Sequence, residues 1–367
     1  MKDKTPVSYC PALFQHICFM RKLFIVSVLA GLVLLLDSFS KESLRAVYAK
    51  PPAEWPRPYI DSGVQWTELG LLPESPLQQQ KDSLKDLIEL GKALFFDTRL
   101  SGSGKISCST CHQPELNWTD GKERSEGHEG TIVARNAPTI QNAWFYKKLF
   151  WDGRARDLQD QAFAPIVSES EMHSEMQEVI SKLRKINGYR EMFRKAYGTA
   201  DIDPDRMTEA IATFEKTITS NKSRFDEFLA GNKKALTGSE LRGLHLFRTK
   251  ARCINCHNGP LFTDNQFHKT GLASGDVGLY KVTHKEEDTG KFKTPSLRDV
   301  MRTGPWLHDG SMKSIPVIID LYKKGPAGAD RLIRPLMLSG KERKDLQAFL
   351  EALSSAPLPF NKPVLPQ

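Results

Sequence analysis

Apolar residues recur every three or four positions in several stretches of this chain, which is the spacing of an amphipathic helix. Ser83 and Thr237 precede two of these stretches, and each stands three positions before an acidic residue, as in a capping box. A further helix is expected from about Met207 to Ile218, and a last one follows Ser339, which has Glu342 in the capping-box position. The apolar positions are Leu84, Leu87, Ile88 and Leu94 in the first stretch, Leu241, Leu244 and Phe247 in the second, and Leu346, Phe349, Leu350 and Leu353 in the last.

No stretch shows sustained alternation of apolar and polar residues, so the expected fold class is mainly α. Pro- and Gly-bearing stretches at Pro51–Pro58, Asn232–Gly238 and Gly325–Gly328 punctuate the helices. At 367 residues the chain is long enough for two domains. We expect the boundary between them near Gly231.

One five-residue pattern occurs twice, as Cys108-Ser109-Thr110-Cys111-His112 and as Cys253-Ile254-Asn255-Cys256-His257. Two thiols at this spacing can each add to a vinyl group of a porphyrin, while the following His ligates the iron. A zinc ribbon would place both Cys pairs on one metal, but it gives no reason for a His after each pair. The sequence therefore predicts two covalently bound c-type haems.

The segments around the two motifs also resemble each other. Gly91-x-x-Leu94-Phe95 precedes the first motif and Gly243-x-x-Leu246-Phe247 precedes the second. Trp118-Thr119-Asp120 and Phe262-Thr263-Asp264 follow them. This internal duplication predicts two cytochrome c-like domains, residues 50–231 and 232–367, each wrapping one haem.

Residues 1–49 are predicted to be a signal peptide or an N-terminal anchor. Arg21 and Lys22 precede the apolar run Phe24–Leu36, and Val47-Tyr48-Ala49 suits cleavage before Lys50. The run is shorter than a membrane span needs, which favours export over an anchor, the one membrane attachment the sequence suggests. Export to the periplasm agrees with the haem motifs, because bacteria attach c-type haems outside the cytoplasmic membrane.

Composition adds little to this interpretation. Four of the six cysteines lie in the haem motifs and the other two, Cys10 and Cys18, lie in the leader, so no disulfide is needed. The formal net charge is +8, yet no basic run interleaved with aromatic residues indicates nucleic-acid binding. We interpret the charge as a surface property that suits an acidic redox partner.

Further landmarks between and after the motifs narrow the function. They are Arg135-Asn136-Ala137-Pro138-Thr139, Phe150-Trp151-Asp152-Gly153-Arg154, Asp160-Gln161-Ala162, Pro165, Glu171-Met172 and Leu307-His308-Asp309-Gly310. With the two motifs, this series resembles the bacterial di-haem cytochrome c peroxidase family, including its MauG-like members, from about Leu87 to Leu353. The resemblance implies an exported oxidoreductase in which hydrogen peroxide reacts at the first haem and electrons arrive through the second haem.

The resemblance also implies roles for individual residues. His112 would be the proximal ligand of the peroxidatic haem and His257 that of the electron-transfer haem, with Trp151 between the two. Gln161 and Glu171 match the polar pair on the open face of the first haem, and Pro165 shapes that pocket.

Glu171 is the candidate acid and base, because cleaving the O–O bond of peroxide moves a proton between its oxygens. A carboxyl group that is desolvated beside a haem has a raised pKa, which suits this transfer at neutral pH.

The sequence does not decide the second axial ligand of either haem iron. His128 stands eight residues before Asn136, where peroxidases of the family carry a removable distal His; the alternative is a solvated loop histidine. Tyr322 stands fourteen residues after His308, where other members have Met and MauG-like members have Tyr. Met301 and Met312 are competing ligands of the second haem, and Tyr322 would otherwise only pack on its helix.

The family also holds a calcium ion between the haems, for which Asn136, Thr303 and Pro305 are the matching residues. The electron source is expected to be a small cytochrome c or cupredoxin, or side chains of a protein substrate. The alternative of another class is a non-catalytic di-haem electron-transfer cytochrome. Gln161 and Glu171 count against it, because such a carrier needs no distal carboxylate.

Overall fold

A computed structural model describes residues 44–272 and 275–367. Residues Pro51–Gln367 form one compact unit, distinct from the N-terminal unit Met1–Lys50. Of the predicted leader, residues 1–49, only 44–49 are described, so its apolar run Phe24–Leu36 lies outside the described residues. Among those that are described, no helix has both the length and the apolar character to cross a membrane.

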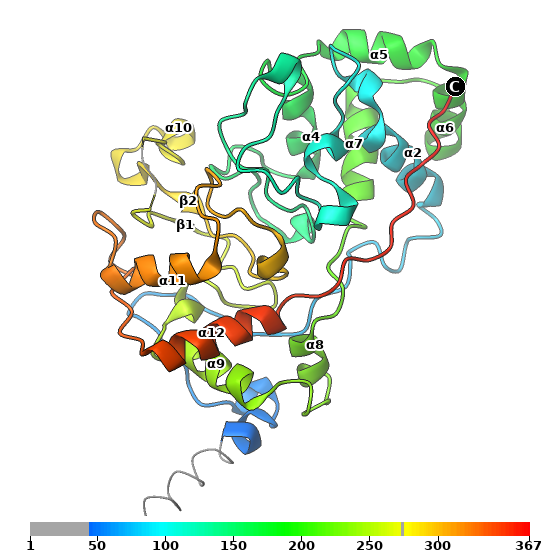
Figure 1. Cartoon of the computed structure of the whole chain (residues 1–367). Coiled ribbons are helices and arrows are strands. Elements are labelled where there is room, and N and C mark those ends of the chain that lie inside the picture. Colours follow the sequence, from blue (N-terminus) through cyan, green and yellow to red (C-terminus); the bar gives the residue numbers. More distant parts are fainter. Residues whose placement is uncertain (1–43, 273–274) are drawn as a thin grey trace, which may run out of the picture. The chain divides into compact units, whose positions relative to one another are not determined.

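The structure is mainly helical, as the sequence predicts (Figure 1). The α-helices are α2 (Lys85–Phe96), α3 (Cys108–Cys111), α4 (Leu158–Val167), α5 (Met176–Arg184), α6 (Asn187–Tyr197), α7 (Pro204–Glu215), α8 (Arg224–Leu229), α9 (Gly238–Arg248), α10 (Tyr280–Thr283), α11 (Ile315–Lys324) and α12 (Gly340–Ala352). Single-turn 3₁₀ helices are η1 (Pro52–Glu54), η2 (Thr98–Leu100), η3 (Pro114–Leu116), η4 (His128–Gly130), η5 (Ala143–Phe145), η6 (Cys253–Asn255), η7 (Glu286–Asp288) and η8 (Val300–Arg302). Strands β1 (Phe267–His268) and β2 (Phe292–Lys293) pair antiparallel, with Phe267 opposite Lys293.

The expected helix starts are confirmed in three cases and wrong in one. Helices α9 and α12 begin with the capping boxes at Thr237 and Ser339. Helix α7 begins a little earlier than expected, with the Asp203 side chain as its cap. The capping box at Ser83 does not form, because Ser83 Oγ donates to Gln80 O within a preceding turn. Helix α2 therefore starts after Leu84 with no side-chain cap.

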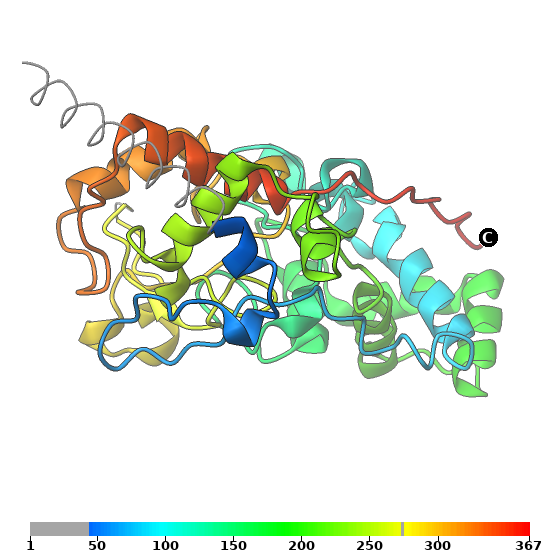
Figure 2. The ribbon, with the colours of Figure 1, turned by 90° about the horizontal axis from the view of Figure 1, so that it is seen from below.

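The duplicated glycines lie at matching helix crossings. A Cβ atom on Gly91 of α2 would lie 1.8 Å from Ala210 O of α7, and one on Gly243 of α9 would lie 2.0 Å from Asp345 O of α12. Both distances are far below van der Waals contact, so only glycine lets each helix pair approach this closely. The same contact builds the core of each half of the compact unit. The first half carries the Cys108–His112 motif and the second half carries the Cys253–His257 motif. Figure 2 shows α2 and α7 towards one end of the compact unit and α9 and α12 towards the other.

Each crossing is covered by the same cluster of three aromatic rings. In the first half Phe95 lies 6.0 Å from Trp118 and 5.4 Å from Phe214, between ring centroids. In the second half the corresponding distances from Phe247 are 5.9 Å to Phe262 and 5.3 Å to Phe349. These rings place the residues that follow each haem motif against the helix crossing.

The structure extends the repeat beyond what the sequence alone suggested, to residues 135–167 and 292–324. Asn142 and Asp299 both adopt left-handed φ of 57° and precede η5 and η8. Isolated β-bridges then join Leu149 to Ala155 and Trp306 to Met312. Helices α4 and α11 follow at the same register. Trp151 therefore corresponds to His308, and Pro165 corresponds to Tyr322.

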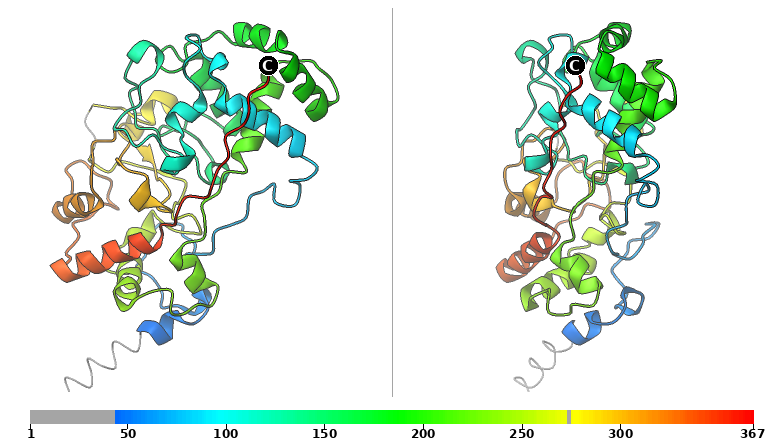
Figure 3. Two further views of the ribbon diagram at one scale, coloured as in Figure 1. Left: turned by 45° about the vertical axis from the view of Figure 1, so that its right-hand side comes forward. Right: turned by 90° about the vertical axis from the view of Figure 1, so that its right-hand side faces the viewer.

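The two ends of the compact unit each pack on the opposite half. Near its N-terminus, Asp61 N donates to Asn255 Oδ1 at 2.8 Å, within the second haem motif. The C-terminal segment runs from α12 along the first half (Figures 1 and 3). There the Phe360 ring stacks on Phe96 at 5.4 Å, and Gly188 N donates to Gln367 O at 2.9 Å. These contacts hold the two halves together; the boundary near Gly231 stays a prediction.

Candidate functional site

Both C-x-x-C-H motifs line one cavity of about 1210 Å³. This exceeds the roughly 300 to 1,000 Å³ of a typical single ligand pocket. Four motif thiols and two imidazoles lie on its walls, which are otherwise mostly apolar. The donor set and the space therefore fit two haems attached by thioether bonds.

The first motif is held in place by its own capping interactions. Ser107 caps the short helix α3, and Ser107 N donates to Thr110 Oγ1 at 3.0 Å. His112 Nδ1 lies 3.1 Å from Trp118 O, which leaves the other ring nitrogen for iron. Burial lowers the pKa of His112, so the imidazole is kept in the neutral form that ligates metal.

The second motif has the same arrangement on a 3₁₀ turn. His257 Nδ1 lies 3.0 Å from Phe262 O, and burial again lowers the pKa of the imidazole. Asn255, between the two cysteines, is buried and donates to Tyr59 O at 2.8 Å. The N-terminal part of the compact unit therefore fixes the second motif.

Helix α4 and the turn after it bring Gln161, Pro165 and Glu171 to the cavity wall. Asp157 caps α4 by accepting from Asp160 N at 2.9 Å. After the helix ends, Met172 N donates to Pro165 O at 3.1 Å, which folds the turn back onto α4. All three residues predicted to shape the open face of the first haem therefore share one wall.

The electrostatics of Glu171 suit a proton carrier. Burial raises the pKa of the carboxyl group, and the positive charge of Arg154 opposes this shift without cancelling it. A carboxyl group whose pKa is raised in this way holds a proton more readily than an ordinary glutamate, which suits an acid and base.

Trp151 lies where the two halves meet. Its Nε1 donates to Asn136 O at 3.0 Å, and its backbone oxygen accepts from Lys293 N at 2.9 Å. In return, Asn136 N donates to His308 O at 2.8 Å. The loop of each half is therefore bonded to the matching segment of the other half.

A network of ion pairs reinforces this junction. Arg135 contacts Asp152 at 2.6 Å and Asp276 at 2.7 Å, and Asp152 also contacts Arg154 at 3.0 Å. Burial favours a raised pKa for Asp276, but Arg135 and the Gly278 N–H outweigh it and hold the pKa at about 2. Both carboxylates stay ionised, so the loop carrying Trp151 is clamped to the second half.

Tyr322 on α11 lines the cavity at the second motif, as expected for its axial ligand. Burial raises the pKa of its hydroxyl group well above the ordinary value, so without a bound cation the phenol keeps its proton. Neither Met301 nor Met312 is among the residues of this wall. Of the three candidates, Tyr322 alone lines this wall, and its ligation of the second iron stays a prediction.

His128 does not line the cavity, although its neighbour Gly127 does. Its ring stacks on His173 with centroids 4.4 Å apart and planes at 13°. The structure therefore does not bring His128 to the first haem site. Distal ligation by His128 stays a prediction that requires this stack to separate.

The three candidate calcium residues, Asn136, Thr303 and Pro305, lie on the same cavity wall. The Asn136 amide donates to Lys122 O at 2.9 Å and to Glu123 O at 3.2 Å. These contacts fix the side chain at the junction of the halves, which suits an ion between two haems. Calcium binding stays a prediction.

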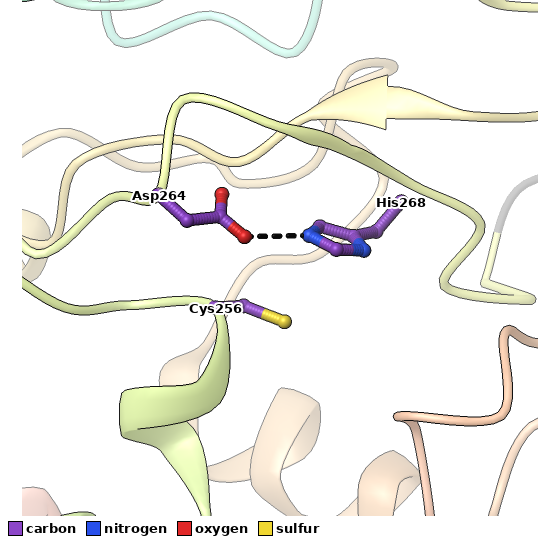
Figure 4. A group of neighbouring side chains, drawn as sticks. All are labelled: Cys256, Asp264 and His268. Atoms are coloured by element: carbon purple, nitrogen blue, oxygen red, sulfur yellow. Dashed lines mark hydrogen bonds and ion pairs between the residues drawn. The ribbon is translucent and has the colours of Figure 1, made fainter. Parts of the chain in front are cut away.

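Cys256, Asp264 and His268 form a cluster whose potential metal-ligating atoms lie within 4.8 Å of one another (Figure 4). Asp264 Oδ2 lies 2.7 Å from His268 Nε2. Haem attachment converts the Cys256 thiol into a thioether, which removes the strongest ligand of such a site. We therefore interpret the cluster as part of the wall around the second haem.

Two cavity residues had no role in the sequence analysis. Glu215 at the end of α7 is 3% exposed, and its Oε2 has no hydrogen-bond partner among the described residues. Lys293 is 9% exposed and lies on the wall between the halves. The repeat could have identified Lys293, because Lys293-Thr294-Pro295 stands at the register of Asn136-Ala137-Pro138.

Comparisons with known proteins agree with this site. The family profile of di-haem cytochrome c peroxidases matches residues 85–234. The chain is 39% identical over 285 residues to the methylamine utilization protein MauG of Methylophilus methylotrophus, covering 76% of this chain and 85% of the relative. It is 36% identical over 317 residues to cytochrome c551 peroxidase of Nitrosomonas europaea, covering 84% and 92%.

Solved structures show the same fold. A MauG-like protein associated with microbial copper homeostasis superposes with a TM-score of 0.69 at 30% identity, over 82% of this chain and 93% of that one. The diheme peroxidase BthA from Burkholderia thailandensis superposes with a TM-score of 0.65 at 21% identity, over 86% and 98%. The chain therefore belongs to the di-haem cytochrome c peroxidase family of peroxidase-type enzymes, whose two c-type haems correspond to its two C-x-x-C-H motifs.

Proposed function

We propose that this protein is an exported, MauG-like enzyme in which hydrogen peroxide reacts at the first haem site and a protein supplies the electrons through the second. The observation that carries the proposal is the difference between the two distal walls. Gln161 and Glu171 face the cavity in the first half, whereas Tyr322 faces it in the second. A haem held by the first motif would thereby keep a face accessible to a substrate, and Tyr322 would close the one held by the second motif.

Reduction of hydrogen peroxide to two water molecules consumes two protons and two electrons. The first haem supplies the iron at which the peroxide binds. Glu171 transfers a proton from one peroxide oxygen to the other, so that water can leave. Gln161 orients the peroxide by hydrogen bonding, and Pro165 limits the space beside it.

Electrons cross the junction at Trp151, which the hydrogen bond to Asn136 and the Arg135 network hold in one orientation. Tyr322 would offer the second haem a hard oxygen donor, which stabilises oxidised states of iron. This ligand favours the MauG-like branch, in which side chains of a protein substrate are the electron source. A small cytochrome c or cupredoxin is the second candidate donor, as for the relative that is a cytochrome c551 peroxidase.

The leader, the calcium residues and His128 complete the proposed function. The leader 1–49 directs the chain to the periplasm, as a cleaved signal peptide or a retained anchor. Asn136, Thr303 and Pro305 hold a calcium ion between the haems. If His128 ligated the first haem at rest, reduction would be needed to release it; without that ligation the first haem would be open at rest.

Absorption and electron paramagnetic resonance spectra of the oxidised holoprotein test the proposal. We expect one high-spin haem that changes on adding peroxide and one low-spin haem that does not bind small ligands. Partial reduction before peroxide would reveal a removable His128 as a gain of high-spin signal. Two inert low-spin haems, before and after one-electron reduction, would show a plain electron carrier instead.

A further inference from the structure

Lys293 carries a buried amino group that forms no ion pair with any carboxylate of the described residues. It lies on β2, and its Nζ is 3.4 Å from the centroid of the Tyr146 ring. Among the described residues no Asp or Glu oxygen forms a salt bridge with it. A cation–π contact is weaker than an ion pair, so Tyr146 alone does not replace the lost hydration.

The burial of Lys293 is therefore unfavourable in the protein alone. Desolvation by burial lowers the pKa of this group to about 7. Nearby Lys291 shows the usual solution, since its Nζ contacts Asp288 at 2.9 Å. Buried charges in proteins are paired, so a charged Lys293 needs an anion, and the described part of the chain does not supply one.

The place of Lys293 identifies that anion. Its side chain lines the cavity that both haem motifs share, and each haem carries two propionates. Two residues further on, the Pro295 backbone is a hydrogen-bond partner that acts on the His257 imidazole. The second haem is thus the nearer one along the chain.

We propose that Lys293 is the counter-ion of a propionate of the second haem and, through its positive charge, raises the reduction potential of that haem. The proposal rests on haem attachment at Cys253, Cys256 and His257, not on the peroxide reaction. It gives the second half a fixed cation that offsets part of the potential-lowering effect of a Tyr322 ligand.

The repeat supports the assignment independently. Lys293 stands where the first half has Asn136, and the two backbones bond to the opposite loops in the same way, to Trp151 O and His308 O. Asn136 is one of the residues proposed to hold calcium. Under that proposal each half places a positive charge at the same register, one from a bound ion and one from its own side chain.

Spectroelectrochemical titration of the holoprotein at fixed pH tests the proposal with Lys293→Met, Lys293→Arg and the control Lys291→Met. Removing a unit charge near the iron should lower the ratio of reduced to oxidised second haem about tenfold at a given potential, or about 59 mV. Lys293→Arg keeps the charge and should stay near the wild type. Lys291→Met removes an ammonium that is already paired and more exposed, so it should also leave the potential of the second haem near the wild-type value.

Resonance Raman spectra provide the second readout, because propionate bending bands respond to the loss of a bonded cation. An unchanged potential in Lys293→Met with both haems attached would overturn the proposal. So would a shift in Lys293→Arg equal to that in Lys293→Met, or unchanged propionate bands. These results are separate from peroxide reactivity, so they stand whether or not the first haem site is peroxidatic.

Discussion

Helix α4 in the first half and helix α11 in the second occupy the same place in the repeat, yet they present different groups to the cavity. Gln161 and Pro165 face it from α4, while the residues at the same positions of α11 are Ile318 and Tyr322. A proline ring has no atom that can ligate iron, whereas a phenol oxygen can. Under the proposed function, exchanging one side chain in a duplicated helix would separate an open iron from a closed one.

The loops before these helices differ in a similar way. Trp151 and His308 correspond to each other, and both backbones bond across the junction. The His308 ring stacks on Phe292 with centroids 3.6 Å apart, while the Trp151 indole bonds to Asn136 O. The duplication produced two positions at the junction, and an easily oxidised indole occupies one of them. The two halves therefore present different side chains at the same point of the junction.

Removing the carboxyl group of Glu171 should have the largest effect on the functional difference between the two halves. Glu171→Gln keeps the shape but cannot transfer a proton, so the reaction with peroxide should slow by about 10² to 10⁴-fold. Stopped-flow absorption at the first haem measures this rate. Glu169→Gln, an exposed change in the same turn, is the matched control. Equal rates in the wild type and in Glu171→Gln would remove Glu171 from the mechanism.

Changing Tyr322, the proposed ligand of the second haem, should have the next largest effect. Tyr322→Met replaces a hard oxygen donor with a thioether, which stabilises ferrous iron and should raise the potential of the second haem. We expect about 0.1 V or more, within the roughly 0.8 V that axial ligands span. Tyr280→Met, at another tyrosine of the cavity wall, should leave the potential near the wild-type value. If both variants behave alike, a residue other than Tyr322 ligates the iron.

Both halves have a glycine at a close helix crossing, Gly91 in the first and Gly243 in the second, and substituting each one tests this shared feature. Gly91→Ala and Gly243→Ala each drive a methyl group into a backbone oxygen and should cost about 1 to 3 kcal/mol of unfolding free energy. Denaturant titration followed separately at each haem should show the mutated half losing its haem signal first. Gly238→Ala is the control, because its nearest neighbour, Arg242 Nη1, is 3.6 Å away. Two silent variants would mean that the helix pairs can separate without cost.

How much of this could be predicted from the sequence depends on the range of the interaction. The capping boxes at Thr237 and Ser339 are local, and the structure confirms both. The one at Ser83 fails, because a preceding turn takes its hydroxyl group. The haem motifs and the glycines at Gly91 and Gly243 were also visible, since the duplication repeats them.

The rest of the site depends on contacts between distant segments. Nothing near His128 in the sequence shows that its ring stacks on His173. Each end of the compact unit packs on the opposite half, as Phe360 does on the first half. This packing is likewise not visible in any local pattern. Buried charge is the hardest case, because Lys293 and Glu215 resemble ordinary surface residues until the helices are packed.

Substituting Glu215 should have the smallest of the expected effects. It tests a clear contrast between α7 and α12, the helices that cross Gly91 and Gly243. Phe214 contacts the first glycine and Phe349 the second, so Glu215 corresponds to Leu350, and both line the cavity. Burial alone raises the pKa of Glu215 from 4.5 to about 8. The first half therefore holds a protonated acid where the second half has an apolar side chain.

This shift predicts how stability depends on pH. Between about pH 4.5 and 8 the unfolded chain loses the proton of Glu215 while the folded protein keeps it, so folding becomes less favourable as pH rises. Glu215→Gln should flatten this slope and gain at least about 1 kcal/mol of unfolding free energy near pH 8, since one pKa unit corresponds to about 1.4 kcal/mol. Thermal or denaturant unfolding of the holoprotein at a series of pH values measures it, with the exposed Glu209→Gln as control. A slope unchanged by Glu215→Gln would mean that a group bound in the cavity already neutralises the carboxylate, and the contrast with Leu350 would then be one of charge and not of protonation.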